Sequence, residues 1–251
     1  SGQCRAWHGK GPQKMLRTRM RFCVAMAVPM IMATEGFMLS SPTNWSVRRH
    51  HGVRAMSGMA GGGSESKRAL CILAEGFEEL EAVAPIDILR RANIEVTVAS
   101  LSQDRLVKGR NGISVMADVD LDAALSTSSY DAIIVPGGPP AVPSIGTLKK
   151  DKRVLELLQQ QMSAGRVVSA ICAAPSVLHE AGVLEGKKYT AHFSVESVVP
   201  KLDKSSAVVV DGNLITSQGA GTGTQFGLAL VEKLKDKATA DEIAASICWK
   251  G

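Results

Sequence analysis

Short apolar runs alternate with helix-type patterns along the chain from Arg68 onward. Strand-type apolar runs, typical of strands buried on both faces of a sheet, cover residues 69–74, 132–135 and 167–171. Residues 95–100 alternate polar and β-branched positions and predict a further strand. Helices are predicted over residues 78–92, 149–164, 175–181, 223–234 and 238–247, and hairpins over residues 106–116 and 207–217. This alternation predicts an α/β fold with a mostly parallel central sheet that is covered by helices on both faces.

Charge divides the 251 residues into two parts. The first 64 residues carry nine Lys and Arg against one acid, Glu35, whereas the rest carry 20 basic and 23 acidic side chains. The part that is predicted to fold, residues 65–251, is therefore slightly acidic, and no nucleic-acid partner is expected. The chain has no run of eighteen apolar residues, so no membrane-spanning helix is expected either.

The first 64 residues have the composition of a targeting segment followed by a linker. Three arginines precede a short apolar run at residues 22–33, and a second Arg- and Ser-bearing stretch follows at residues 46–54. Residues 61–64, Gly-Gly-Gly-Ser, predict a flexible linker. We expect a disordered segment that is cleaved on import into a mitochondrion or plastid. The alternative is a cytoplasmic protein that starts at Met56 or Met59.

Motifs for the commonest cofactors are missing from the sequence. It contains no C-x-x-C pair, no H-E-x-x-H motif and no Walker A loop, which removes the most frequent zinc and nucleotide signatures. Its five cysteines are too few and too scattered for a disulfide scaffold. The composition, 45% hydrophobic and 21% charged, is that of a globular chain with a sizeable core.

Cys172 is the first candidate for a reactive side chain. It lies between a predicted strand and a predicted helix that has Pro175 near its first turn, which is the geometry of a nucleophile elbow. A thiol at a helix amino terminus faces unpaired N–H groups, so we expect a lowered thiol pKa. The alternative is a buried structural cysteine, which is the role predicted for Cys71 inside the first strand.

Further candidates surround the other predicted strand ends. Glu81 precedes Pro85 by four residues, so its carboxyl at a helix break could be desolvated and protonated, although acids in a first turn usually complement the helix dipole. His192 is a candidate proton donor or acceptor. Gly137 and Gly138 follow a buried strand, and the N–H groups of Gly138 and Ala173 could stabilise an oxyanion, unless the glycines only form a turn.

These motifs together resemble the DJ-1/ThiJ/PfpI family, in its DJ-1-like branch. The resemblance covers about residues 67–250 and rests on five ordered motifs: 69–74, 76–81, 135–138, 170–175 and 190–192. It implies a flavodoxin-like three-layer sandwich that forms a homodimer. It also implies that Cys172 is the elbow cysteine, Glu81 its protonated partner and His192 a nearby histidine. Phe193 departs from the proline that is frequent at this position.

The resemblance further implies roles for the surrounding groups and two functions. Gly138 and Ala173 match oxyanion-type amides, and Arg110 matches an arginine brought to the site by the dimer partner. The first function is a glyoxalase or protein deglycase that acts on methylglyoxal and glyoxal without a metal or other cofactor. The second is an oxidative-stress sensor or redox-regulated chaperone that uses oxidation of the same cysteine. Because both functions use the same residues, the sequence does not separate them.

Overall fold

The computed structural model describes residues 66–126, 129–140 and 143–251. The predicted targeting segment and linker, residues 1–64, lie outside these ranges, as do Cys4 and Cys23. Within the described ranges, no helix is both long enough and apolar enough to cross a membrane.

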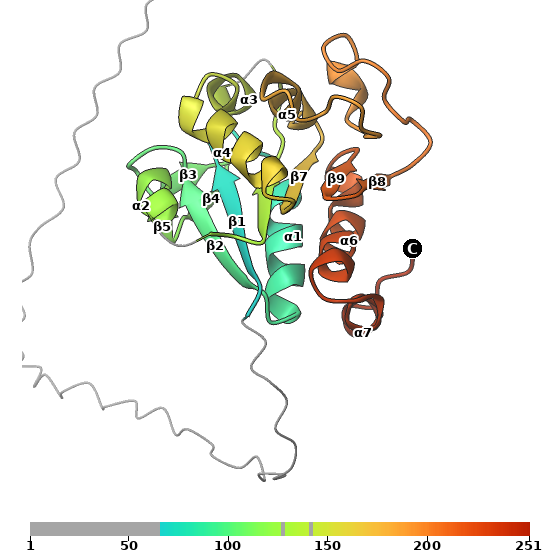
Figure 1. The fold of residues 1–251 in the computed structure, drawn as a ribbon. Helices are drawn as coiled ribbons and strands as arrows, with labels where there is room; N and C mark the ends of the chain where they lie inside the picture. The colour runs from blue at the N-terminus through green and yellow to red at the C-terminus, as the bar shows by residue number, and fades with distance from the viewer. Residues whose placement is uncertain (1–65, 127–128, 141–142) are drawn as a thin grey trace, which may run out of the picture. The chain divides into compact units, whose positions relative to one another are not determined.

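Seven of the described strands form one twisted sheet in the order β5-β2-β1-β6-β7-β9-β8 (Figure 1). They are β1 (Arg68–Leu73), β2 (Glu95–Ser100), β5 (Val119–Asp120), β6 (Ala132–Val135), β7 (Val167–Ile171), β8 (Val208–Asp211) and β9 (Leu214–Ser217). All neighbours pair in parallel except β8 and β9, which form the predicted hairpin around Gly212. The central order β2-β1-β6-β7-β9 is the 2-1-3-4-5 order of flavodoxin-like folds, so the predicted fold class is confirmed.

Helices cover both faces of this sheet. The helices on one face are α3 (Pro143–Leu148), α4 (Lys152–Ser163) and α5 (Pro175–Glu180), and those on the other are α1 (Glu79–Arg91), α6 (Gly223–Leu234) and α7 (Lys237–Ser246). Within the second layer, α1 and α6 lie side by side (Figure 1). A short helix, α2 (Leu121–Ser126), follows β5 and packs into the first layer.

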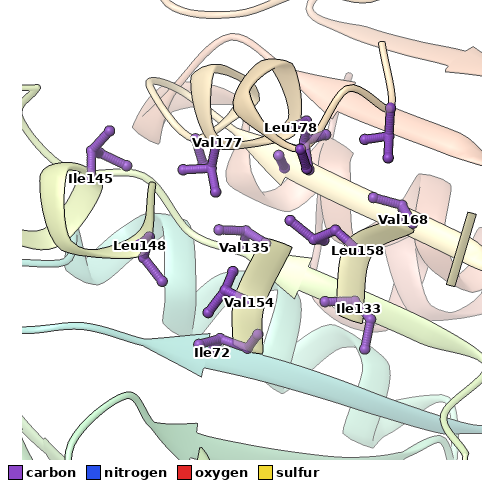
Figure 2. Packing of buried hydrophobic residues seen from close by; sticks show 14 of the residues in the cluster. Ile72, Ile133, Val135, Ile145, Leu148, Val154, Leu158, Val168, Val177 and Leu178 are labelled. Carbon is purple, nitrogen blue, oxygen red and sulfur yellow. The ribbon is translucent and has the colours of Figure 1, made fainter. Parts of the chain in front are cut away.

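Each central strand contributes side chains to two separate hydrophobic cores. In β1, Leu70 and Ile72 pack toward α4, whereas Cys71 and Leu73 pack toward α1 and α6. Figure 2 shows the first of these cores, where Ile72 and its neighbours from β6 and β7 meet Val154 of α4. Burial on both faces explains why the strands are continuous apolar runs in the sequence.

The structure also differs from the predicted elements in several places. Helix α4 begins at Lys152, three residues later than predicted, because the Asp151 side chain accepts a hydrogen bond from the N–H of Arg153 and caps the helix there. The elements β5, α2 and α3 were not predicted. The hairpin predicted over residues 106–116 is confirmed as β3 (Leu106–Lys108) and β4 (Ser114–Met116), which form a separate two-stranded sheet.

Candidate active site

Cys172 occupies a strained turn between β7 and α5. Its φ angle is +63°, which is a left-handed conformation that residues other than glycine rarely adopt. The turn is held on both sides: the N–H of Cys172 donates to the Ser217 carbonyl (2.9 Å), and its carbonyl accepts from the His192 N–H (2.8 Å). The predicted strand-to-helix elbow is therefore present. Strain of this kind persists where the surrounding structure enforces it and is concentrated at functional sites.

Gly137, at the end of the neighbouring strand β6, packs directly against this turn. A Cβ atom placed on Gly137 would lie 2.5 Å from Oε2 of Glu81, 2.7 Å from Cβ of Cys172 and 2.8 Å from the Ile171 carbonyl oxygen. No real Cβ atom fits at such distances, so only glycine lets the backbone approach this closely. The close approach brings Glu81 and Cys172 together at the carboxyl ends of the parallel strands, where the sequence placed the site.

Gly138 is held in the same way by a different set of neighbours. A Cβ atom on Gly138 would lie 2.4 Å from Oγ of Ser144 and 2.7 Å from the Gly76 carbonyl oxygen. Among the described residues, Oγ of Ser144 and Oε2 of Glu81 are buried side-chain atoms without a partner in normal hydrogen-bond geometry. Both atoms therefore flank the Gly137–Gly138 pair. Ser144 was not a sequence candidate, because nothing in its local pattern distinguishes it from a surface serine.

The Glu81 carboxyl is almost completely buried, with 1% of the residue exposed. Its pKa is raised from 4.5 to about 7, and burial is the largest cause. A hydrogen bond from Cys172 lowers the pKa, and the charge of Glu78 raises it. The backbone N–H of Glu81 is bonded to the Glu78 side chain, which caps the start of α1 (2.9 Å). The carboxyl is thus desolvated, as predicted, and it changes protonation state near neutral pH.

The Cys172 thiol does not have the lowered pKa that the sequence predicted. Burial, which is the largest cause, and the charge and hydrogen bonding of Glu81 raise the thiol pKa, whereas the N–H of Ala173 lowers it. The helix dipole contributes little, because α5 has six residues and begins three residues after Cys172. The expectation of a thiolate stabilised by a helix terminus is therefore wrong for this state of the protein.

His192 lies beside Glu81 across Gly219. A Cβ atom on Gly219 would be 3.5 Å from Cδ2 of His192 and 3.9 Å from Oε1 of Glu81, so both side chains face the same glycine. Nδ1 of His192 accepts from the Ser194 N–H (3.2 Å) and pairs with the Ser194 hydroxyl (2.8 Å), which leaves the proton of the neutral ring on Nε2. Burial, and then the charge of Arg110, lower the His192 pKa. The ring is thus a neutral donor through Nε2.

A cavity of about 480 Å³ opens next to His192 and Gly219. Phe193 lines it, with its ring 4.0 Å from the His192 ring and 77% of the residue exposed. Lys204 lies on the same cavity wall. The volume is sufficient for a small organic molecule.

Arg110 of the same chain acts electrostatically on the site. Its charge lowers the pKa of both Glu81 and His192, and its backbone N–H donates to the Phe77 carbonyl (2.9 Å). The resemblance implied an arginine supplied by a dimer partner; that role stays a prediction, and within one chain Arg110 already acts on Glu81 and His192. The homodimer stays a prediction.

The remaining described cysteines lie outside this cluster. Cys71 is completely buried in β1, which confirms its prediction as a core residue, and burial raises its thiol pKa. Cys248 is exposed near the end of the chain. Within the described residues, no group of three or more His, Cys, Asp or Glu side chains could hold a metal ion.

The fold and the site define a class of flavodoxin-like proteins with a cysteine elbow beside a buried carboxyl. The family model of the DJ-1/PfpI family matches residues 67–233, so the chain belongs to this family. It is similar to Protein dj-1beta of Drosophila melanogaster, with 39% identity over 72% of this chain and 97% of that protein. The crystal structure of Drosophila melanogaster DJ-1beta aligns with a TM-score of 0.70 and 37% identity, over 74% of this chain and 100% of that one. The glutathione-independent glyoxalase DJR-1.2 of Caenorhabditis elegans is 32% identical over 72% of this chain and 96% of its own length.

Proposed function

We propose that this protein is a glutathione-independent glyoxalase that converts methylglyoxal to lactate and glyoxal to glycolate. The observation that carries the proposal is the contact between an elbow cysteine and a buried carboxyl whose pKa is about 7. A general acid–base works best when its pKa lies near the operating pH. The similarity to a glutathione-independent glyoxalase supports the same reaction.

The first step joins the sulfur to the aldehyde. At rest the pair carries a Cys172 thiol next to the Glu81 carboxylate, because the thiol pKa is raised above that of the carboxyl. As the sulfur bonds to the aldehyde carbon, the thiol proton passes to Glu81 and negative charge develops on the aldehyde oxygen. The N–H groups of Ala173 and Gly138 would stabilise this oxyanion, which then takes the proton from Glu81 to give a hemithioacetal and leaves Glu81 as the carboxylate.

The second stage moves hydrogen between the two carbons of the bound substrate. Glu81, as carboxylate, removes the proton from the former aldehyde carbon, while the Nε2–H of His192 supports the charge that develops on the neighbouring ketone oxygen. Return of the proton to the ketone carbon, together with transfer of the hydroxyl proton of the first carbon to the former ketone oxygen, gives a lactoyl thioester on Cys172. Water then cleaves the thioester to lactate and restores the thiol. One carbon is oxidised as the other is reduced, so methylglyoxal and one water molecule yield lactate.

The proposal is tested by measuring lactate formation from methylglyoxal with the purified protein and no glutathione. We expect steady-state turnover near neutral pH, with heat-denatured protein as the control. A protein that consumes methylglyoxal without releasing lactate would contradict the glyoxalase assignment. A parallel assay on methylglyoxal adducts of N-acetylarginine distinguishes a deglycase: a deglycase releases N-acetylarginine faster than the adduct decays spontaneously.

A second candidate function, a sensor of oxidants, is favoured by the unpartnered Oε2 of Glu81. Successive reactions of the Cys172 sulfur with two molecules of peroxide would give a sulfinate and two molecules of water. An oxygen added to the sulfur would give a protonated Glu81 the hydrogen-bond acceptor that it lacks.

The sensor function predicts selective oxidation. Because Glu81 can accept the thiol proton as the sulfur reacts, mild peroxide should add two oxygens to Cys172, leave the buried Cys71 unchanged and carry the exposed Cys248 no further than reversible oxidation. Peptide mass spectrometry measures each site in the same sample. Equal sulfinate at Cys172 and Cys248 would show that exposure alone controls the reaction and would contradict the sensor function.

A further inference from the structure

Glu79 is a buried acid that neither proposed function uses. It is the first residue of α1, two positions before Glu81, and 4% of it is exposed. Its carboxylate accepts three hydrogen bonds from the tip of the β3–β4 hairpin: from the Asn111 N–H (2.7 Å), from Nδ2 of Asn111 (3.0 Å) and from the Ile113 N–H (3.3 Å). More than thirty residues of sequence separate the acid from this tip.

The hairpin tip fits closely around the Glu79 carboxylate. A Cβ atom on Gly109 would lie 2.5 Å from Oε1 of Glu79, so glycine is required for the approach. Although burial raises the pKa of Glu79, hydrogen bonds from its own backbone, Asn111 and Ile113 leave the pKa below its ordinary value. Glu79 is therefore an ionised group that holds the hairpin tip against the start of α1.

Arg110 is part of the segment that Glu79 holds. Its neighbour Asn111 supplies two of the three hydrogen bonds, and its own N–H is fixed to the Phe77 carbonyl. Among the described residues, the charged and titratable groups with the largest effects on Glu81 are Cys172, Glu78 and Arg110, and Arg110 has the largest such effect on His192. Arg110 is thus the shared electrostatic neighbour of the two groups to which we assign proton transfer.

We propose that Glu79 is a positioning residue, whose carboxylate fixes the hairpin tip so that Arg110 stays beside Glu81 and His192. The effect of this positioning on turnover rests on the proposed glyoxalase function, whereas its effect on the titration of His192 does not. We call the contact between the Glu79 carboxylate and the hairpin tip, residues 109–113, the clamp. Loss of the carboxylate would release the tip and move the Arg110 guanidinium away from Glu81 and His192.

The direction in which the pKa of His192 shifts distinguishes a positioning role of Glu79 from a direct effect of its charge on His192. Removing a nearby negative charge would by itself lower the pKa of His192, because the imidazolium would lose an attractive neighbour. Releasing Arg110 would instead raise it, because Arg110 lowers this pKa in the folded protein. The two explanations therefore predict opposite shifts for the same substitution.

The experiment is an NMR titration of His192 in the full chain and in the variants Glu79→Gln, Arg110→Gln and the double variant. We expect the His192 pKa to rise in Arg110→Gln, and to rise in Glu79→Gln by about half of that amount or more. The double variant should match Arg110→Gln, because the clamp has nothing left to position. A fall of the pKa in Glu79→Gln, or a further rise in the double variant, would overturn the proposal.

Two additional variants keep the test independent of folding and of activity. Asn111→Ala removes one donor to Glu79 without changing any charge, and we expect a smaller rise of the His192 pKa. If Glu79→Gln does not fold, Asn111→Ala decides the question, and an unchanged His192 pKa would refute the clamp.

Asp104→Asn is the matched control. It removes a carboxylate that accepts a hydrogen bond from the Leu106 N–H at the base of the hairpin, and it should leave the His192 pKa unchanged. If methylglyoxal is not turned over at all, the glyoxalase assignment fails while the titration still tests the clamp.

Discussion

Replacing Cys172 by alanine should lower lactate formation from methylglyoxal about a thousandfold or more, which is the usual loss when an enzyme is deprived of its nucleophile. The physical reason is that, without the sulfur, no side chain next to the Ala173 N–H can form the bond to the aldehyde carbon. Alanine keeps the Cβ atom that packs against Gly137 and places no new strain on the left-handed turn. The measurement is kcat/KM without glutathione, together with thermal unfolding to verify that the variant is folded.

Cys248→Ala is the matched control for this experiment. It removes a thiol of the same chemistry that is exposed and remote from Glu81, so kcat/KM should stay within about twofold of the wild-type value. If Cys172→Ala is folded and retains more than a tenth of the activity, the covalent mechanism is refuted. If both variants lose activity, the loss does not come from the elbow.

The free energy of unfolding of Glu81→Gln, taken as its difference from the wild type, should be larger at pH 8 than at pH 4. The folded-state pKa of about 7 lies above the ordinary value of 4.5, so the folded protein binds this proton more tightly than the unfolded chain. The stability contributed by the protonated group is complete below pH 4.5 and is lost as the pH rises toward 7. The difference between the two pKa values corresponds to about 3 kcal/mol in the free energy of unfolding.

Urea unfolding at pH 4, 6 and 8, at one protein concentration, measures this effect as the difference between variant and wild type. We expect the difference to increase by about 3 kcal/mol across this range, because glutamine stays neutral throughout. Glu75→Gln, at an exposed acid just before the site, should show no such trend. A difference for Glu81→Gln that does not change with pH would mean that the carboxyl titrates normally. The same variant should lose lactate formation, since an amide cannot accept the thiol proton.

The sequence predicted the central sheet and the strand ends because burial on both faces leaves a clear signal. Apolar runs identify β1, β6 and β7, and the parallel arrangement then requires the residues after β6 and β7 to meet at one edge. The proximity of Gly137 and Cys172 follows from that rule alone. Short elements such as β5 and α3 leave no such signal, since two to six residues do not show a period.

Other properties of the site depend on three-dimensional information that the sequence does not carry. The direction of the Cys172 pKa shift is set by how deeply the sulfur is buried and by its distance from a carboxylate, and local sequence pattern reports neither. Glu79 has the pattern of an ordinary first-turn acid. Its partner loop is more than thirty residues away, so only the folded chain shows that it bonds to Asn111, the neighbour of Arg110.

The left-handed turn at position 172 limits which amino acids can replace the cysteine. Residues branched at Cβ are disfavoured at positive φ, so threonine and valine should not be accepted there, whereas serine matches cysteine in shape. Glycine would relieve the backbone strain but would leave no reactive atom at the strand edge. Among hydroxyl-bearing replacements, serine is therefore the one through which this scaffold could change its chemistry, either in evolution or by engineering.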